Sequence, residues 1–310
     1  MAKRVQVGKI DLDTCGTAFL LGVTREDEVK VVRGDASPQD LADPSVICIE
    51  VGGSGRVDQN NWDHHAAGGP QDSATLQAWW SLGQDAAMAK LAQWAGWDVY
   101  ASHAAIGALR SELRLVEYIH LLDTQGPEAL RRRTGGDVVF PTLSDCFAGM
   151  LLLTAREPSV EQLHKGVELL QSVLEAGQDP FGTICGFDSY AEAKRVNNAQ
   201  IAKAVEMAQW TTTQAGRKLG YMEADLFGAP GALSGVGAEI VVVFNPTFGN
   251  PPAPKFTIAG NGIKVDAALP ELNALEQGWG GPATGTILGS PRGGSSLTLK
   301  EVVEIVKKTC

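Results

Sequence analysis

The chain has few of the residues that mark several common classes of protein. Its five cysteines are scattered over 310 residues and include no C-x-x-C pair. This pattern is neither a disulfide framework nor a zinc ribbon, and it predicts a cytoplasmic protein in a reducing environment. No apolar run is long enough to span a bilayer, so we expect no membrane partner. The N-terminal stretch "MAKRVQVGKID" becomes strand-like almost at once, which predicts that there is no signal peptide.

An excess of positive charge is also absent, because the formal net charge at pH 7 is -10. Such a chain has no general basic field with which to displace the counterions of nucleic acid. We therefore expect no binding to long duplex DNA. A small anionic substrate stays compatible with this charge, because a local cluster or a metal ion can reverse the field inside a cleft.

The order of apolar runs predicts an α/β fold. Short strands alternate with helical stretches in the first half, which is typical of a mainly parallel sheet flanked by helices. A long helical stretch follows, and from Gly220 onward glycine, proline and short strands dominate. We expect an N-terminal domain over 1–187, a helical linker over 188–218, and a smaller α+β domain over 219–310.

Histidine is scarce as well, yet two of the five histidines stand side by side in "NNWDHHAAGG". The triplet of Asp63, His64 and His65 rarely arises by chance at this histidine content. Imidazole and carboxylate together suit Mn²⁺, Fe²⁺ or Zn²⁺. A histidine ligand needs a carboxylate to fix its tautomer, which Asp63 would supply. The alternative is a surface histidine pair in a glycine-rich loop.

Acidic residues at predicted strand ends add candidate ligands. Asp11 and Asp13 are two apart at the end of a predicted strand, so we expect their carboxylates to share a face. Glu50 ends another strand, and ligands bind at the carboxyl ends of strands in open α/β sheets. Two close carboxylates repel each other unless a cation lies between them. The alternatives are a pair of helix-capping acids and a solvated strand end.

A predicted helix supplies two more candidates in "EYIHLLDTQG". His120 and Asp123 are three residues apart and therefore share a helix face. Asp123 is the better metal ligand of the two, because a lone helical histidine such as His120 is commonly a packed or capping residue. Four carboxylates balance two divalent ions, which would activate a water molecule for attack on phosphorus. His65 would then contact the phosphate and stabilise the charge of the transition state.

These motifs, in this order, resemble those of the DHH phosphoesterase superfamily. That group includes RecJ exonuclease, nanoRNases, pAp phosphatases, cyclic-dinucleotide phosphodiesterases and family II pyrophosphatases. The resemblance implies hydrolysis of a phosphoester with two Mn²⁺ ions, or with Mg²⁺ or another divalent ion. The short spacing between Glu50 and the triplet is nearer to that of the melanocyte-proliferating-gene-type exonucleases. The chain departs from the family at Val7, where a histidine is usual, at Glu50, where an aspartate is usual, and at Gly281.

The segment "GWGGPATGTILGS" resembles the glycine motif of the C-terminal domain that accompanies this family, although the histidine of that motif is replaced near Gly281. Gly280 and Gly281 would let backbone N–H groups approach a phosphate or a base. Arg292 would bind a phosphate in bidentate fashion, and Trp279 would stack on a base. The alternative is a tight turn with a packed tryptophan.

The sequence therefore predicts a metal-dependent phosphoesterase that acts on a short oligonucleotide or a small nucleotide. One alternative is a pyrophosphatase or polyphosphatase. Another is a nucleotide-binding regulatory protein without turnover, since the departures from the family motifs weaken the site. The sequence leaves open the substrate, the metal and whether the chain forms a homodimer.

Overall fold

The chain divides into two compact units, Met1–Lys194 and Arg195–Cys310. Among the residues described, no helix has the length and apolar character that crossing a membrane requires. The computed structural model describes residues 2–65, 70–83, 103–136, 139–154, 157–248, 252–281, 285–291 and 293–310.

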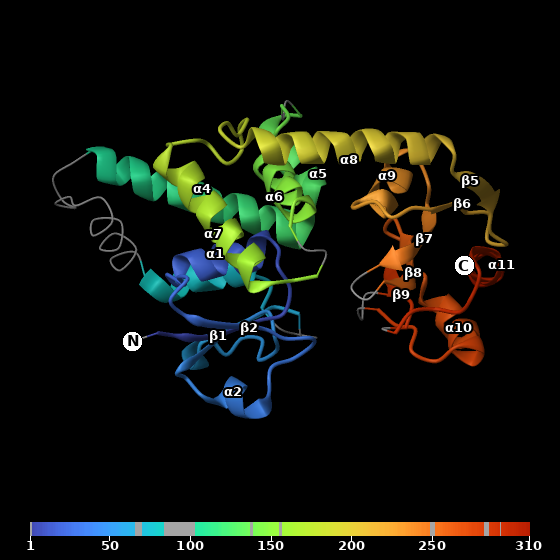
Figure 1. Ribbon diagram of the computed structural model, residues 1–310, viewed down its shortest axis with the longest axis horizontal. Helices are drawn as coiled ribbons and strands as arrows, with labels where there is room; N and C mark the ends of the chain where they lie inside the picture. The colour runs from blue at the N-terminus through green and yellow to red at the C-terminus, as the bar shows by residue number, and fades with distance from the viewer. Residues whose placement is uncertain are drawn as a thin grey trace. The chain divides into compact units, whose positions relative to one another are not determined.

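The N-terminal unit is built on a parallel sheet (Figure 1), which confirms the α/β class predicted from the sequence. Its four strands are all parallel, in the order β2-β1-β3-β4. They are short, so their carboxyl ends lie close to the loops that carry the acidic motifs. The strands are β1 (Arg4–Val7), β2 (Glu28–Val31), β3 (Val46–Ile49) and β4 (Asn61–Trp62).

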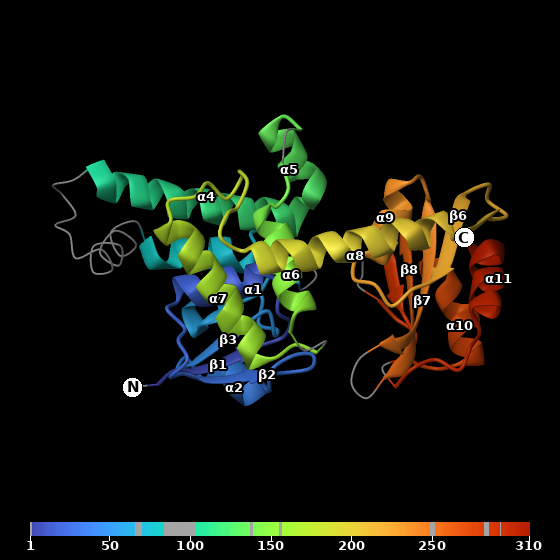
Figure 2. The same cartoon turned by 45° about the horizontal axis from the view of Figure 1, so that its top comes forward.

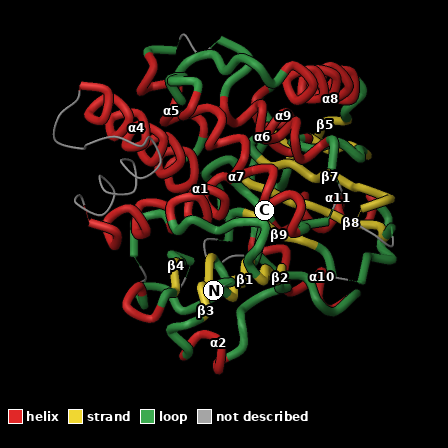
Figure 3. Tube along the Cα trace, turned by 60° about the vertical axis from the view of Figure 1, so that its left-hand side comes forward, coloured by secondary structure: helices red, strands yellow, loops and turns green. Residues whose placement is uncertain are grey.

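Helices cover both faces of this sheet (Figure 3). The larger core joins β1 and β3 to all the helices of the unit except α2, and to a helical stretch over residues 74–83. Helix α2 packs with the opposite face through a small apolar cluster around Val46 and Cys48, and α5 also packs against α4. The helices of this unit are α1 (Leu12–Leu20), α2 (Pro38–Ala42), α4 (His103–Gln125), α5 (Pro127–Thr134), α6 (Leu143–Leu152) and α7 (Val160–Glu175).

The turn from β1 into α1 corrects one expectation. Asp11 and Asp13 were expected at a strand end, but β1 stops at Val7 and α1 starts at Leu12. The chain leaves the sheet at Gly8, where a Cβ atom would lie 2.3 Å from the carbonyl oxygen of Glu50. Asp11 then caps α1, which places Asp13 in the first turn of the helix rather than on a strand.

The C-terminal unit is a mixed sheet between helices (Figure 2), as the predicted smaller α+β domain requires. Its order is β5-β6-β7-β8-β9, and only β6 and β7 are parallel neighbours. Helices α10 and α11 pack on one face, and α9 packs on the other. The elements are β5 (Gln209–Thr212), β6 (Lys218–Glu223), α9 (Ala229–Gly235), β7 (Ile240–Phe248), β8 (Ala253–Gly260), α10 (Leu269–Leu275), β9 (Ile287–Gly289) and α11 (Leu299–Thr309).

The predicted linker is helical over only part of its length. Helix α8 (Asp188–Glu206) begins where the linker was expected to begin. The next residues form β5 and the start of β6, so the expectation of a helix to residue 218 is wrong. Threonine is β-branched and favours an extended backbone, which accounts for the strand in "QWTT".

An additional pairing extends β9 at the glycine-rich segment. Gly280 and Gly289 exchange both backbone hydrogen bonds, at 3.2 and 2.7 Å. The adjacent Gly281 lies so close to the strand that a Cβ atom there would be 1.9 Å from the carbonyl oxygen of Ile287. The glycine at 281 is therefore required by the approach of two backbones.

We predict that Gly281→Ala loosens the edge formed by β8 and β9, because the added methyl group collides with the carbonyl of Ile287. Overpacking of this kind costs about 1–3 kcal/mol. Amide hydrogen exchange in β8 and β9 should accelerate by about tenfold, as measured by mass spectrometry. Gly280→Ala is the matched control, because a Cβ atom there meets no heavy atom of the described chain within 4 Å. Equal exchange rates in the two variants would contradict the prediction.

Candidate metal centre

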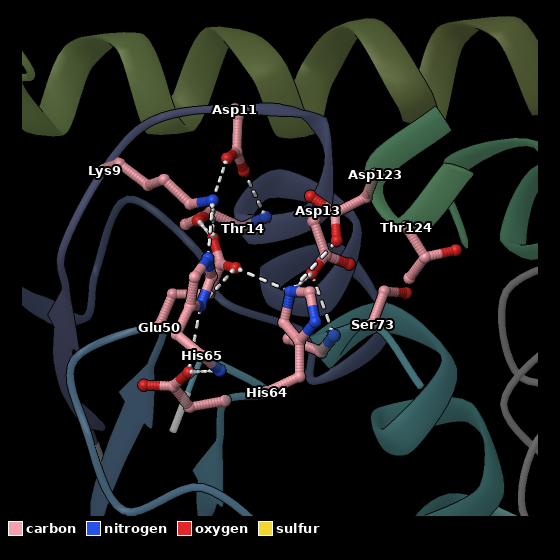
Figure 4. Close-up of polar contacts among 12 residues, drawn as sticks. Lys9, Asp11, Asp13, Thr14, Glu50, His64, His65, Ser73, Asp123 and Thr124 are labelled. Atoms are coloured by element: carbon pink, nitrogen blue, oxygen red, sulfur yellow. Dashed lines mark hydrogen bonds and ion pairs between the residues drawn. The ribbon is translucent and has the colours of Figure 1, made fainter. Parts of the chain in front are cut away.

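Four side chains from separate segments of the N-terminal unit converge beyond the ends of β3 and β4 (Figure 4). Asp13, Glu50, His64 and Asp123 each offer one ligand atom, and these atoms all lie within 4.8 Å of one another. All four belong to the ligand set predicted from the sequence. The fold therefore brings together residues that are more than a hundred positions apart in the chain.

Glu50 follows β3 directly and has an unusual backbone conformation. Its φ angle is 54°, in the left-handed region, which costs about 1–2 kcal/mol for a residue with a Cβ atom. The side chain is fully buried, and its Oε2 accepts a hydrogen bond of 2.8 Å from the Thr14 hydroxyl. Backbone strain combined with a buried carboxylate is typical of a functional site.

Asp13 is held by the start of another helical stretch, over residues 74–83. Its two carboxylate oxygens accept hydrogen bonds of 2.8 Å from the backbone N–H groups of Ala74 and Thr75. A helix N-terminus stabilises such an anion. Burial nevertheless raises the pKa of Asp13 to about 7, and repulsion from Glu50 and Asp123 adds to the shift. These carboxylates therefore need a cation if all three are to be ionised.

His64 faces all three carboxylates through one atom. Its Nε2 is 3.0 Å from Asp123 Oδ2, 3.5 Å from Glu50 Oε1 and 3.9 Å from Asp13 Oδ2. The interactions with Asp123 and Glu50 raise the pKa of His64 to about 10 when no metal is bound. Burial opposes ionisation of Asp123, but its contact with His64 outweighs burial and lowers the pKa of that carboxyl.

Hydrogen bonding supports a cation at this point. Glu50 Oε1, His64 Nε2 and Asp123 Oδ2 are buried, and within the described part of the chain they have no hydrogen bond beyond the ion-pair contacts between the histidines and the carboxylates. Buried polar atoms rarely have so few partners, and here three of them point toward one place. The carboxylate oxygens of Asp123, Glu50 and Asp13 lie 3.0 to 3.9 Å from His64 Nε2, which suits ligands around one ion with bonds of roughly 2.1 Å. The residues thus fit one divalent ion bound by three carboxylates and an imidazole.

His65 lies at the rim of the centre, with half of its side chain exposed. Its Nδ1 is 3.0 Å from Asp63 Oδ1, and its backbone N–H donates to the same oxygen at 2.8 Å. Asp63 also accepts from the N–H of Gly52, and these bonds outweigh burial and lower the pKa of its carboxyl. The bond to Asp63 raises the pKa of His65. Asp63 therefore orients His65, and not the ligand His64 as the sequence had indicated.

Two solved structures are similar to this chain over almost its whole length. A pGpG-specific phosphodiesterase, PggH from Vibrio cholerae, superposes with a TM-score of 0.55 at 14% identity, over 98% of this chain and 97% of that one. The DHH domain of a member of a ribosomal protein family has a TM-score of 0.41 at 13% identity, covering 98% and 85%. No protein-family profile and no curated protein sequence matches the chain.

The chain has the fold of the pGpG-specific phosphodiesterase. This fold agrees with the DHH resemblance of the motifs, while the nearer branch of exonucleases stays a prediction.

Within this fold, two of the predicted metal ligands have other partners. Asp11 is the N-cap of α1, where its Oδ1 accepts from Thr14 N–H at 2.8 Å and its Oδ2 pairs with Lys9 at 2.8 Å. His120 accepts a hydrogen bond of 3.3 Å from the N–H of Ser73 through Nδ1. Neither belongs to the four-residue group. Metal ligation by Asp11 and His120 therefore stays a prediction that the convergence of these side chains does not support.

The predicted substrate-binding residues of the C-terminal unit differ from one another in their exposure to solvent. Trp279 is only 5% exposed and packs in the core, with its ring centroid 5.8 Å from that of Phe256. Stacking of this ring on a base is therefore ruled out in this conformation, and the packed alternative is correct. Gly280 is exposed, but its N–H is already bonded to Gly289. Gly281 is exposed as well, and Arg292 lies outside the described residues.

Sequence reasoning missed one residue of the centre, Lys9. Its ammonium group lies 2.8 Å from Asp11 Oδ2 and 3.3 Å from Glu50 Oε2. It also lies 3.4 Å from the Nε2 atom of His65. A basic residue two positions before the first acid of the motif was the only available signal, and it is a weak one.

We predict that metal binding releases about one proton at pH 7.5. His64 carries a proton below about pH 10 in the metal-free chain, and Nε2 must lose it to bind an ion. The apparent affinity for Mn²⁺ should therefore rise by about tenfold per pH unit between pH 7 and 8.5. Calorimetry in buffers of different ionisation enthalpy counts the released protons. An affinity that does not change with pH would show that His64 is not a ligand.

Proposed function

We propose that this protein is a metal-dependent phosphodiesterase of small nucleotides. The observation that carries the proposal is the convergence of three buried atoms, on Glu50, His64 and Asp123, that have no hydrogen bonds beyond their ion-pair contacts, in a fold shared with a phosphodiesterase. A purely structural role gives no reason to gather three carboxylates and an imidazole, two buried and two partly buried, with ligand atoms within 4.8 Å of one another. The similar structure of a pGpG-specific phosphodiesterase supports the reaction class.

The chemistry follows from the ligand set. A divalent ion held by Asp13, Glu50, His64 and Asp123 would lower the pKa of a water molecule and polarise a phosphoryl oxygen. Mn²⁺ is the proposed ion, because a mixed carboxylate and imidazole set suits it better than it suits Mg²⁺. Glu50 has a role beyond charge, since its strained backbone aims the carboxylate at the ion while Thr14 fixes the second oxygen.

His65 is the proposed contact to the substrate phosphate. Its ring is half exposed, and Asp63 fixes its orientation by accepting from both Nδ1 and the backbone N–H. Asp63 raises the pKa of His65, and a protonated ring would donate a hydrogen bond to a phosphoryl oxygen as charge develops. Asp63 is 3% exposed and acts as a positioning residue through His65.

The proposed substrate is a short oligonucleotide, such as a linear dinucleotide, or a small nucleotide such as pAp. The net charge of -10 disfavours long nucleic acid, and the ion-binding group occupies one place rather than a long surface track. Exposed Gly280 and Gly281 remain candidates for contact with the substrate, although Trp279 does not. All five cysteines are unpaired, which supports a cytoplasmic location.

The proposal predicts Mn²⁺-dependent hydrolysis of one substrate class. Purified protein would be incubated separately with four substrates, namely 5′-labelled pGpG, pAp, cyclic di-AMP and pyrophosphate, of which only pGpG carries the 5′ label. The products would be separated by chromatography. We expect turnover of a nucleotide and little turnover of pyrophosphate. Hydrolysis of pyrophosphate alone would favour a pyrophosphatase, and no hydrolysis of any substrate by the Mn²⁺-loaded protein would refute the proposal.

A matched pair of variants on helix α4 tests the site. Asp123→Asn removes one ligand charge and should lower turnover at least about a hundredfold. Glu117→Gln removes a carboxylate from the same helix at a surface ion pair with Arg133, so turnover should stay within about twofold of the parent. His64→Ala should behave like Asp123→Asn. If Asp123→Asn and Glu117→Gln retain equal activity, the assigned ligands are wrong.

A further inference from the structure

We propose that the ammonium group of Lys9 stands in place of a second divalent ion, so that the centre holds a single metal. This inference deepens the proposed function and rests on it for the role of the site. The fold resemblance implies two ions, and the four-residue group accounts for only one. The carboxylate of Asp11 and the second oxygen of Glu50 lie outside this group and need another positive charge nearby.

Lys9 is positioned as a cation of the centre (Figure 4). Its Nζ lies 2.8 Å from Asp11 Oδ2, 3.3 Å from Glu50 Oε2 and 3.4 Å from His65 Nε2. An ammonium group has three N–H donors and no acceptor. The two carboxylate oxygens therefore accept two of these donors, and the third is free for His65 Nε2 when that ring is neutral or for a substrate oxygen.

Glu50 joins the two cationic positions. Its Oε1 lies with His64 Nε2 and Asp123 Oδ2 in the group that would hold the ion, while its Oε2 faces Lys9 and Thr14. A carboxylate that bridges two metal ions divides its oxygens in the same way. Here one end of the bridge reaches an ammonium group instead.

With Lys9 in place, the residues available for a second ion do not make a complete site, because the ammonium group takes the oxygens of Asp11 and Glu50 that such an ion would need. The only further candidate group in the described chain consists of Glu50, His64 and His65, and it shares two members with the first. Asp11 is occupied by Thr14 N–H and by Lys9. Val7, at the end of β1, is fully buried and has no ligand atom. A second ion would also have to approach the positive charge of Lys9.

The same placement gives Lys9 a direct use in catalysis. Its side chain is 42% exposed, so a phosphate that reaches the ion can also meet the ammonium group. In a two-metal site the second ion binds a phosphoryl oxygen and offsets its charge. Lys9 would supply one positive charge and movable N–H donors for that purpose.

Manganese stoichiometry in the parent protein is the first test. Calorimetry and native mass spectrometry should find one tightly bound Mn²⁺ per chain, and electron paramagnetic resonance should show an isolated ion. Two ions with an exchange-coupled signal would overturn the proposal without the need for any variant.

Two substitutions at the same position provide the matched comparison. Lys9→Ala removes the charge, so a second Mn²⁺ should bind at least about a hundredfold more tightly than in the parent and couple to the first through Glu50. Lys9→Arg keeps the charge and should still bind one ion. Circular dichroism checks that both variants are folded. A folded Lys9→Ala protein that still binds only one ion would refute the substitution of ammonium for metal.

The Mn²⁺ stoichiometry tests the role of Lys9, and the hydrolysis screen tests the proposed function, so one proposal can be refuted without the other. One bound Mn²⁺ without any hydrolysis would refute the proposed function and leave the single-ion centre standing. Hydrolysis with two coupled ions in the parent would support the function and overturn the role of Lys9.

Discussion

Mutual repulsion among buried carboxylates is the constraint on which this structure depends. Asp13, Glu50 and Asp123 lie together with little access to water, and burial with repulsion raises the pKa of Asp13 to about 7. In the metal-free chain, protonated His64 and Lys9 carry the compensating charge. A divalent ion can replace the proton on His64, but it cannot replace Lys9 without displacing a side chain. The arrangement is therefore stable only with cations present, which is a property of a binding centre rather than of a packed core.

The fold meets this constraint by using the ends of its elements. Short strands β3 and β4 stop just before Glu50 and the histidine pair, and helix starts supply N–H groups to Asp11 and Asp13. The close approach of Gly8 to the Glu50 carbonyl and the left-handed backbone of Glu50 fix the first turn beyond the sheet. Strain at Glu50 is offset by its bonds to Thr14 and Lys9.

The sequence was sufficient for the parallel sheet and for the four residues that converge at the candidate metal centre, because carboxylates and an adjacent histidine pair are the residue types that such a centre uses. It did not separate these four from Asp11 and His120, since a cap or a backbone acceptor uses the same residue types as a ligand. The prediction that Trp279 stacks on a base was wrong for a similar reason, because the same indole ring can either stack on a base or pack in a core. Lys9 was missed because its role depends on a contact with Glu50, 41 positions later, that no local spacing encodes.

Two departures from the superfamily motifs, at Val7 and Glu50, become consistent with each other once Lys9 is included. A buried valine at position 7 removes a ligand, which would leave Asp11 and one oxygen of Glu50 without a metal partner. The ammonium group of Lys9 reaches both of these oxygens. Glutamate at position 50 has one methylene more than aspartate, and this added reach suits a carboxylate that serves an ion on one side and Lys9 on the other. Val7, Glu50 and Lys9 are then parts of a single change, in which the positive charge of a metal ion is replaced by that of a side chain. The departures at Val7 and Glu50 therefore do not mean that the site has lost its function.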